Sequence, residues 1–281
     1  MSVLTINKLT ASVGAEVVGI DPERLGTDDS LSAAILDALE DNGVLVFHDL
    51  HLNPEAQVAF CQRLGEVDRS ADGHHPVSGI YPITLDRKKN KAAEYLKATF
   101  DWHIDGCTPV HDECPQKATV LSAVEVAARG GETEFANAYA AYDTLDAAEK
   151  ERYGKLRVVH SLEASQRRVY PDPTAEQQQR WAARPTHENP LVWTHRNGRK
   201  SLVLGASADY IVGMNLDEGR ALLAELLAHA TTADKVYSHK WSVGDTVIWD
   251  NQGVLHRAAP YEPNSPRHML RTTVLGDEPI Q

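Results

Sequence analysis

Cysteine is scarce in this chain, with three residues among 281. An odd number this small cannot form the disulfide framework of small secreted proteins, so the sequence predicts a reduced, cytoplasmic setting. Long apolar runs are missing too: none approaches the roughly 20 residues needed to cross a bilayer. The first residues, Met1–Lys8, lack the charged stretch and apolar core of a signal peptide. These absences predict a protein with no membrane partner.

Basic residues are also in deficit, because 28 Lys and Arg stand against 40 Asp and Glu and leave a formal net charge of -12. A nucleic-acid binder needs cationic surface to displace phosphate counterions, so this balance argues against a nucleic-acid partner. Small anions could bind only where arginines gather locally against the overall field. With 42% hydrophobic and 24% charged residues, the composition is that of an ordinary globular protein.

Periodicity along the chain predicts a mainly β protein with flanking helices. No repeat and no Gly-, Ser- or Pro-rich linker divides the sequence, so we predict a single domain over 1–281. Predicted strands are Val44–Phe47, Ala118–Val126, Arg157–Ser161, Ser201–Gly205, Asp245–Trp249 and Arg267–Leu275, with a strand pair or bent strand at Thr10–Ile20. Predicted helices are Ser30–Asp41, Asn53–Leu64, Ala138–Tyr153 and Asp217–Ala230. Strands outnumber helices, which favours a β-sandwich or barrel core with helices outside it.

Thirteen histidines are the unusual feature of the composition, and they raise the question of a metal. In the extended motif Asp101-Trp-His-Ile-Asp105, alternate side chains share a face, so His103 and Asp105 point the same way. An imidazole and a carboxylate on one face are two-thirds of the 2-His-1-carboxylate site that suits non-haem Fe(II). A chain with this many histidines is expected to contain such a triplet by chance, so the motif needs support from elsewhere.

That support lies near the C-terminus. His256 comes just after a strong strand, where a third ligand is expected; a hydrogen-bonded core histidine is the alternative. Farther on, Arg267 and Arg271 share one face of the last predicted strand. If that face is interior, each guanidinium needs an anion, because arginine cannot lose its charge. The anion is either a protein carboxylate or the carboxylate of a ligand, which the arginine fork matches with two hydrogen bonds.

Taken together, these motifs resemble the TauD/TfdA family of Fe(II)- and 2-oxoglutarate-dependent dioxygenases. The resemblance extends over almost the whole chain, from Gly14 to Asp277. Its most telling pieces are Trp102-His-Ile-Asp105, Gly130-Gly-Glu-Thr-Glu-Phe-Ala136, Ala140-Ala-Tyr-Asp143, Trp249-Asp-Asn251, and His256 followed by Arg267 and Arg271. The resemblance implies a double-stranded β-helix (a jelly roll, cupin-like) with the iron at its open end. Because relatives form dimers or tetramers, it also implies a possible homo-oligomer.

Carried over residue by residue, the resemblance assigns the metal and cosubstrate sites. His103, Asp105 and His256 are implied to ligate the catalytic Fe(II). Thr133, from the Gly-Gly-x-Thr segment, and Arg267 are implied to bind the distal carboxylate of 2-oxoglutarate. The cofactors are then Fe(II), 2-oxoglutarate as cosubstrate, and O2.

The substrate site is assigned less completely. Arg271 is implied to lie nearer the iron and to meet the acidic group of a small-molecule acid substrate. His75 and Thr99 fall in the variable region before the iron motif and are candidates for substrate contact, with a structural role as the alternative. Several segments look more like the phenoxyalkanoate-cleaving members than like the taurine enzyme. However, Ser207 and Tyr210 stand where the 2,4-dichlorophenoxyacetate enzyme has histidines, which argues against that particular substrate.

The implied reaction is hydroxylation of a C–H bond in a small anionic organic molecule, with release of succinate and CO2. Where the hydroxylated carbon also bears oxygen, nitrogen or sulfur, the product breaks at the C–O, C–N or C–S bond. The alternative function, from another class, is a non-catalytic jelly-roll protein that binds a metal or ligand, with a structural site for an ion such as Zn(II).

Overall fold

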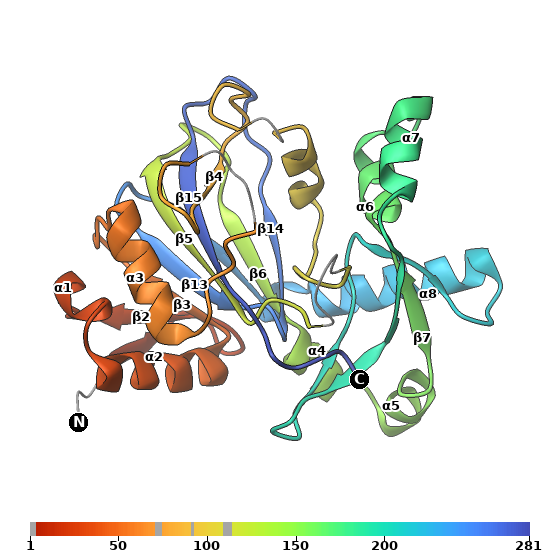
Figure 1. Ribbon diagram of the computed structural model, residues 1–281. Coiled ribbons are helices and arrows are strands. Elements are labelled where there is room, and N and C mark those ends of the chain that lie inside the picture. Colours follow the sequence, from red (N-terminus) through yellow and green to blue (C-terminus); the bar gives the residue numbers. More distant parts are fainter. Residues whose placement is uncertain (1–3, 71–74, 91–92, 109–113) are drawn as a thin grey trace.

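The computed structural model of the chain describes residues 4–70, 75–90, 93–108 and 114–281. Two facing β-sheets form its centre (Figure 1). Within the described residues, the larger sheet has the strand order β1-β2-β3-β13-β5-β15-β4 and the smaller one β12-β6-β14. The bounds of the larger sheet's strands are β1 Thr5–Lys8, β2 Ala15–Val18, β3 Val44–Phe47, β4 Tyr81–Ile83, β5 Ala118–Glu125, β13 Thr246–Asp250 and β15 His268–Val274. Those of the smaller sheet are β6 Thr133–Asn137, β12 Val236–His239 and β14 Val254–Ala258. The predicted β-rich core with outer helices is confirmed.

The central strands of the larger sheet are buried on both faces, and strand alternation divides their side chains between two cores. In β3, Val44 and Val46 join Phe135 of the smaller sheet in the core between the two sheets. Leu45 and Phe47 point the other way, into a core closed by helices. Because side chains alternate along a strand, a continuous apolar run such as Val44–Phe47 fills both cores.

Three helices cover the outer face of the larger sheet: α1 (Pro22–Leu25), α2 (Asp29–Asn42) and α3 (Pro54–Leu64). The predicted helices Ser30–Asp41 and Asn53–Leu64 match α2 and α3 because the sequence marks their ends. Asp28 accepts hydrogen bonds from Ser30 N and Leu31 N at the start of α2, and Gly43 ends it with φ 70°.

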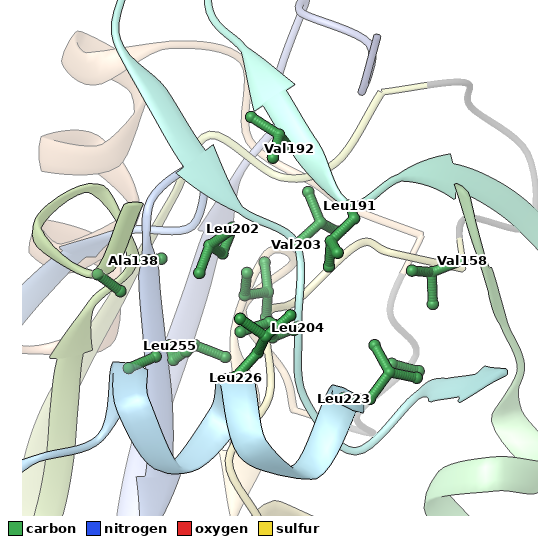
Figure 2. Close-up of a cluster of buried hydrophobic side chains, with 14 of the residues drawn as sticks. Ala138, Val158, Leu191, Val192, Leu202, Val203, Leu204, Leu223, Leu226 and Leu255 are labelled. Carbon is green, nitrogen blue, oxygen red and sulfur yellow. The ribbon is translucent and has the colours of Figure 1, made fainter. Parts of the chain in front are cut away.

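The remaining elements form a second lobe beside the two sheets (Figure 1). Its helices are α4 Ala138–Asp143, α5 Ala147–Tyr153, α6 Leu162–Val169, α7 Ala175–Ala182 and α8 Leu216–Ala230, with the 3-10 turns η1 Tyr95–Phe100 and η2 Ala233–Lys235 elsewhere in the chain. Its strands are β7 Arg157–His160, β8 His187–Pro190, β9 Val192–Thr194, β10 Lys200–Leu202 and β11 Ala208–Ile211. Figure 2 shows Leu223 and Leu226 of α8 against Leu204 in the apolar core of this lobe, which Leu255 of β14 joins to the sheets.

Two sequence predictions need correction. The helix predicted over Ala138–Tyr153 is two helices, because Asp146 starts a new one: its carboxylate accepts from Glu149 N while the Glu149 carboxylate accepts from Asp146 N. The strand pair predicted over Thr10–Ile20 begins earlier, since β2 pairs antiparallel with β1 at Thr5–Lys8. None of the helices in the described part of the chain has the length and apolarity that crossing a bilayer requires.

Candidate active site

Three potential metal ligands, distant in the sequence, come together at the edge of the smaller sheet. His103 and His256 face each other across a backbone bridge, in which the N–H of each donates to the carbonyl of the other at 3.0 and 2.9 Å. One ligand atom from each of His103, Asp105 and His256 lies within 4.8 Å of the other two. The predicted set is therefore assembled in space as two imidazoles and one carboxylate.

Hydrogen bonding and charge prepare these side chains for a cation. Nδ1 of His103 lies 2.8 Å from the Asp101 carbonyl, which favours a proton there and leaves Nε2 with a free lone pair. The Nε2 atoms of His103 and His256 each lie 3.8 Å from an Asp105 oxygen. Burial is the main cause that lowers the pKa of His256, to about 3, so its ring is neutral. Burial alone would raise the pKa of Asp105, but its electrostatic interactions with His256, Arg271 and His103 lower the pKa below its ordinary value.

The segment that carries two of these ligands is held in an extended shape by its neighbours. Trp102 and Ile104 are buried on the side opposite the ligands, as the alternation predicted. Behind the segment, Ala206 N donates to the Trp102 carbonyl at 2.7 Å. Gly205 lies so close that a Cβ there would be 2.8 Å from Cα of His103, and its φ of +117° favours glycine as well.

Arg267 lies fully inside the protein, at 2% exposure, and no described carboxylate forms an ion pair with it within 4.0 Å; Tyr261 and, at longer range, Glu132 are the groups that stabilise its charge. Its Nε donates to the Gly131 carbonyl at 3.2 Å, and its guanidinium lies 4.9 Å from the Tyr261 ring centre. Its Nη1 is buried without a hydrogen-bond partner. A buried cation with an unused donor is costly unless an anion completes the site. The alternative that Arg267 forms a salt bridge to a protein acid is thus not supported.

Thr133 is placed on the same face of the smaller sheet as His256. The register pairs Thr133 with Ala258, two residues beyond His256 on β14. Side chains two residues apart on one strand share a face, and diagonal neighbours are roughly 7–8 Å apart. The approach of Arg267 depends on Gly131, whose φ is +78° and where a Cβ would be 3.0 Å from Cδ and Nε of the arginine.

Arg271 lies in a different and more open environment. Its side chain is 28% exposed, and its Nη1 is 3.5 Å from an Asp105 oxygen. The guanidinium sits over the ring of Tyr81, the residue opposite it in the β15–β4 pairing. Its Nε is buried and unpartnered. This guanidinium therefore borders the ligand cluster and keeps one donor unused.

An open cavity of about 720 Å³ contains His103, Asp105 and Arg271 in its wall. Much of the rest of the wall comes from η1, α6 and the region of α7, and the segments 104–108 and 206–207 complete it. The lining residues include Tyr95, Leu96, Leu162, Ser165, Gln166, Arg180, Arg184 and Ser207. Thr99 is in the wall, although its hydroxyl donates to the Leu96 carbonyl at 2.6 Å. His75 is not among the lining residues; its Nδ1 accepts from Val77 N at 3.1 Å. Contact of either residue with a substrate remains a prediction.

Sequence reasoning missed two residues at these sites. Gln166 is 3% exposed, lines the cavity, and has no side-chain hydrogen bond within the described residues. Trp241, 8% exposed, donates from its indole nitrogen to Oγ1 of Thr133 at 3.0 Å. A one-strand pattern could not identify either residue, because their neighbours come from distant parts of the chain.

Comparison with known proteins agrees with this geometry. Residues 5–273 match the profile of the family described as taurine catabolism dioxygenase TauD, TfdA family. The chain belongs to the TauD/TfdA family. It is accordingly a 2-oxoglutarate-dependent non-haem iron dioxygenase, with Fe(II), 2-oxoglutarate and O2 as its cofactors, and the predicted enzyme class is confirmed.

Individual TauD/TfdA relatives are similar over most of their length. A 2,4-dichlorophenoxyacetate dioxygenase of Cupriavidus pinatubonensis is 35% identical over 85% of this chain and 86% of its own. An (S)-phenoxypropionate/alpha-ketoglutarate-dioxygenase of Sphingobium herbicidovorans is 33% identical over 97% of this chain and 95% of its own. The crystal structure of AAD-2 with Mn(II) and N-oxalylglycine superposes with a TM-score of 0.83, at 32% identity, over 99% of this chain and 100% of that one.

Proposed function

We propose that this enzyme hydroxylates a C–H bond of a small organic anion bound in the 720 Å³ cavity, with 2-oxoglutarate converted to succinate and CO2. The relatives include enzymes named for 2,4-dichlorophenoxyacetate, for (S)-phenoxypropionate and, in Pseudomonas putida, for sulfate esters. These molecules share a small size, an anionic group and an oxygen attached to carbon. Where hydroxylation falls on the carbon beside that oxygen, the product separates at the C–O bond.

The iron would be held by His103, Asp105 and His256, whose donor set fits Fe(II). Two imidazole nitrogens and a carboxylate are the 2-His-1-carboxylate donor set of non-haem Fe(II) oxygenases. When bound, the iron supplies the activation of O2 against the C–H bond. The protein's own contribution is positional, because the backbone bridge between the two histidines and the Asp101 carbonyl hold the ligand atoms in place.

Thr133 and Arg267 would bind the distal carboxylate of 2-oxoglutarate. The unpartnered Nη1 of Arg267 supports this assignment, since a carboxylate there would neutralise the buried guanidinium and accept its unused N–H. Thr133 lies on the same sheet face as His256. A short dicarboxylic acid anchored at this end can therefore extend toward the metal ligands.

Arg271 would bind the acidic group of the substrate. It lines the cavity and borders Asp105, so an anion paired with it is held beside the metal site. Gln166 offers an unused amide in the same cavity wall. Leu96 and Leu162 supply apolar surface for the carbon skeleton. Such a pocket contributes to the reaction mainly by positioning, because it keeps one C–H bond of the substrate near the reacting centre.

We further propose that the two facing sheets form the double-stranded β-helix of the family resemblance, with the ligand cluster at one end. The single-domain organisation and the dimeric or tetrameric assembly remain predictions. One observation carries the proposed function: a three-ligand metal cluster and a buried arginine without an anionic partner are built on the same pair of sheets.

The direct test is a screen for succinate formation from 2-oxoglutarate across carboxylates, sulfonates, sulfate esters and aryloxy acids. Succinate should form above the slow uncoupled background with at least one substrate, and only with Fe(II) and O2 present. Anaerobic Fe(II) plus 2-oxoglutarate should give a weak visible charge-transfer band. A colourless complex with no turnover for any acid would instead favour a structural metal site.

A further inference from the structure

The indole of Trp241 determines which way the hydroxyl of Thr133 can donate. The Nε1–H of Trp241 lies 3.0 Å from Oγ1 of Thr133, and both side chains are buried. An indole nitrogen is only a donor, so Thr133 must be the acceptor in this bond. The polarity follows from chemistry alone, without knowledge of the hydrogen positions.

This bond leaves the single hydroxyl proton of Thr133 uncommitted. No other hydrogen bond involves the Thr133 side chain within the described residues. A hydroxyl has one proton and two lone pairs, so once a lone pair is used by Trp241, the proton is available for an outside acceptor. A carboxylate is an acceptor only, which is the complementary polarity.

Trp241 is itself firmly placed. Its ring meets that of His239 edge-on, with 4.5 Å between ring centres. His239 lies between the Tyr237 hydroxyl, 3.0 Å from its Nδ1, and Asp245, 3.3 Å from its Nε2. Asp245 in turn accepts from Ser242 N at 2.9 Å. Burial lowers the pKa of His239 to about 4, so the ring that supports the indole is neutral.

The indole also closes the wall behind Arg267. Trp241, Gly131 and Arg267 line a small cavity of about 40 Å³. The tryptophan thus hydrogen-bonds one member of the proposed carboxylate site, Thr133, and lines the same small cavity as the other, Arg267. Removing only the indole N–H of Trp241 should leave the Arg267 guanidinium in place and allow the Thr133 hydroxyl to rotate.

We propose that Trp241 is a positioning residue for the cosubstrate: its N–H holds Thr133 as a donor to the distal carboxylate of 2-oxoglutarate. The inference rests on the proposed function of Thr133 and Arg267. Within the described residues Trp241 has no hydrogen bond or ring contact with a metal ligand, and it is not among the residues that line the substrate cavity. Its effect is therefore confined to the cosubstrate and depends on the carboxylate that Thr133 meets.

Calorimetric binding to the Mn(II)-loaded protein tests this without turnover. The ligands are 2-oxoglutarate and 2-oxopentanoate, which has a methyl group in place of the distal carboxylate. Trp241→Phe should raise the Kd of 2-oxoglutarate about three- to tenfold, the effect of one hydrogen bond, and leave that of 2-oxopentanoate unchanged. Trp193→Phe is the matched control, because Trp193 is also buried but its Nε1 has no hydrogen bond in the described part of the chain; it should change neither Kd.

A double-mutant cycle separates positioning from packing. Thr133→Val should weaken 2-oxoglutarate binding, and adding Trp241→Phe to it should cause little further loss, because the indole acts through the hydroxyl. Additive losses, an unchanged Kd in Trp241→Phe, or an equal loss for 2-oxopentanoate would each overturn the proposal. Absence of 2-oxoglutarate binding by the unmodified protein would instead refute the proposed function.

A second measurement needs no change at Trp241, in case its replacement prevents folding. In protein with 15N-labelled tryptophan and Zn(II), one indole N–H signal should shift in Thr133→Val. The same signal should shift when 2-oxoglutarate is added and stay in place with 2-oxopentanoate. If the indole signal that shifts in Thr133→Val does not shift when 2-oxoglutarate is added, the inference is wrong.

Discussion

The two arginines at the start of the last strand region, Arg267 just before β15 and Arg271 within it, have opposite surroundings. Arg267 is sealed among strands, with 2% exposure and a donor that no protein group uses. Arg271 is 28% exposed in a cavity walled by short helices and loops. A closed pocket suits a single ligand such as 2-oxoglutarate. An open cavity lined by short helices and loops suits substrates that differ in shape. The structure thereby separates the proposed cosubstrate site from the proposed substrate site although only three residues lie between the two arginines.

Removing the metal would affect both sites at once, so it has the largest expected effect. Asp105→Ala should abolish succinate formation, because one of three ligands is lost. Tight Fe(II) binding should be lost with it, as measured by equilibrium dialysis. The exposed helix residue Asp37 provides the control, since Asp37→Ala should retain full activity. Retained turnover in Asp105→Ala would mean that Asp105 is not a ligand of the catalytic iron.

Arg267→Met tests the sealed site. The Kd of 2-oxoglutarate should rise roughly ten- to a hundredfold, the effect of a lost charged hydrogen bond. The ligand-free variant should be at least as stable as the unmodified protein in thermal unfolding, because a buried cation without a partner has been replaced by an apolar chain. A clear loss of stability without ligand would mean that a protein anion does neutralise this arginine.

Arg271→Met tests the proposed substrate site in the open cavity. The KM of the best acid substrate found in the screen should rise about tenfold, while the Kd of 2-oxoglutarate changes by less than about threefold. Steady-state kinetics and calorimetry on the same preparation measure both. If the two constants move together, the two sites are not separate.

The smallest expected effect concerns Asp250, at the end of β13 and just before the turn that leads to His256. Burial raises its pKa from 3.8 to about 6, and it accepts a hydrogen bond from the Tyr139 hydroxyl at 3.1 Å. A raised folded pKa means that ionisation opposes folding. The contribution of Asp250 to the free energy of unfolding is therefore fully present below about pH 4 and is lost as the pH rises through 6. Asp250→Asn should remove that loss, worth about 1–3 kcal/mol at pH 7.

Urea unfolding at pH 4.5 and pH 7 checks this, with the variant showing the weaker pH dependence. The affinity for 2-oxoglutarate should stay unchanged, because the group lies outside both sites. An identical pH dependence in the two proteins would show that Asp250 is not held protonated by burial.

Helices with clear end signals were predicted closely, and polar ones were missed. The boundaries of α2, α3 and α8 agree with the predicted ranges to within one or two residues because Asn, Asp and Gly mark their ends. In contrast, α6 and α7 carry almost no apolar stripe: Trp181 is the buried residue of α7. Their capping residues, Ser161 and Thr174, were the available signal. Both helices contribute residues to the wall of the proposed substrate cavity, so the missed elements lie at the site that the sequence predicts least completely.

Local spacing identified the candidate metal ligands and arginines of this protein, and the family resemblance supplied their roles. Alternation along one strand places His103 beside Asp105, and it sets Arg267 and Arg271 on a common side, because the pleat has a period of two residues. Which groups those side chains then meet depends on partners more than a hundred residues away. The unused Nη1 of Arg267, the bridge between His103 and His256, and the bond from Trp241 to Thr133 all arise from cross-strand register and loop packing. Such long-range contacts leave no periodic trace in the sequence, and only the folded chain reveals them.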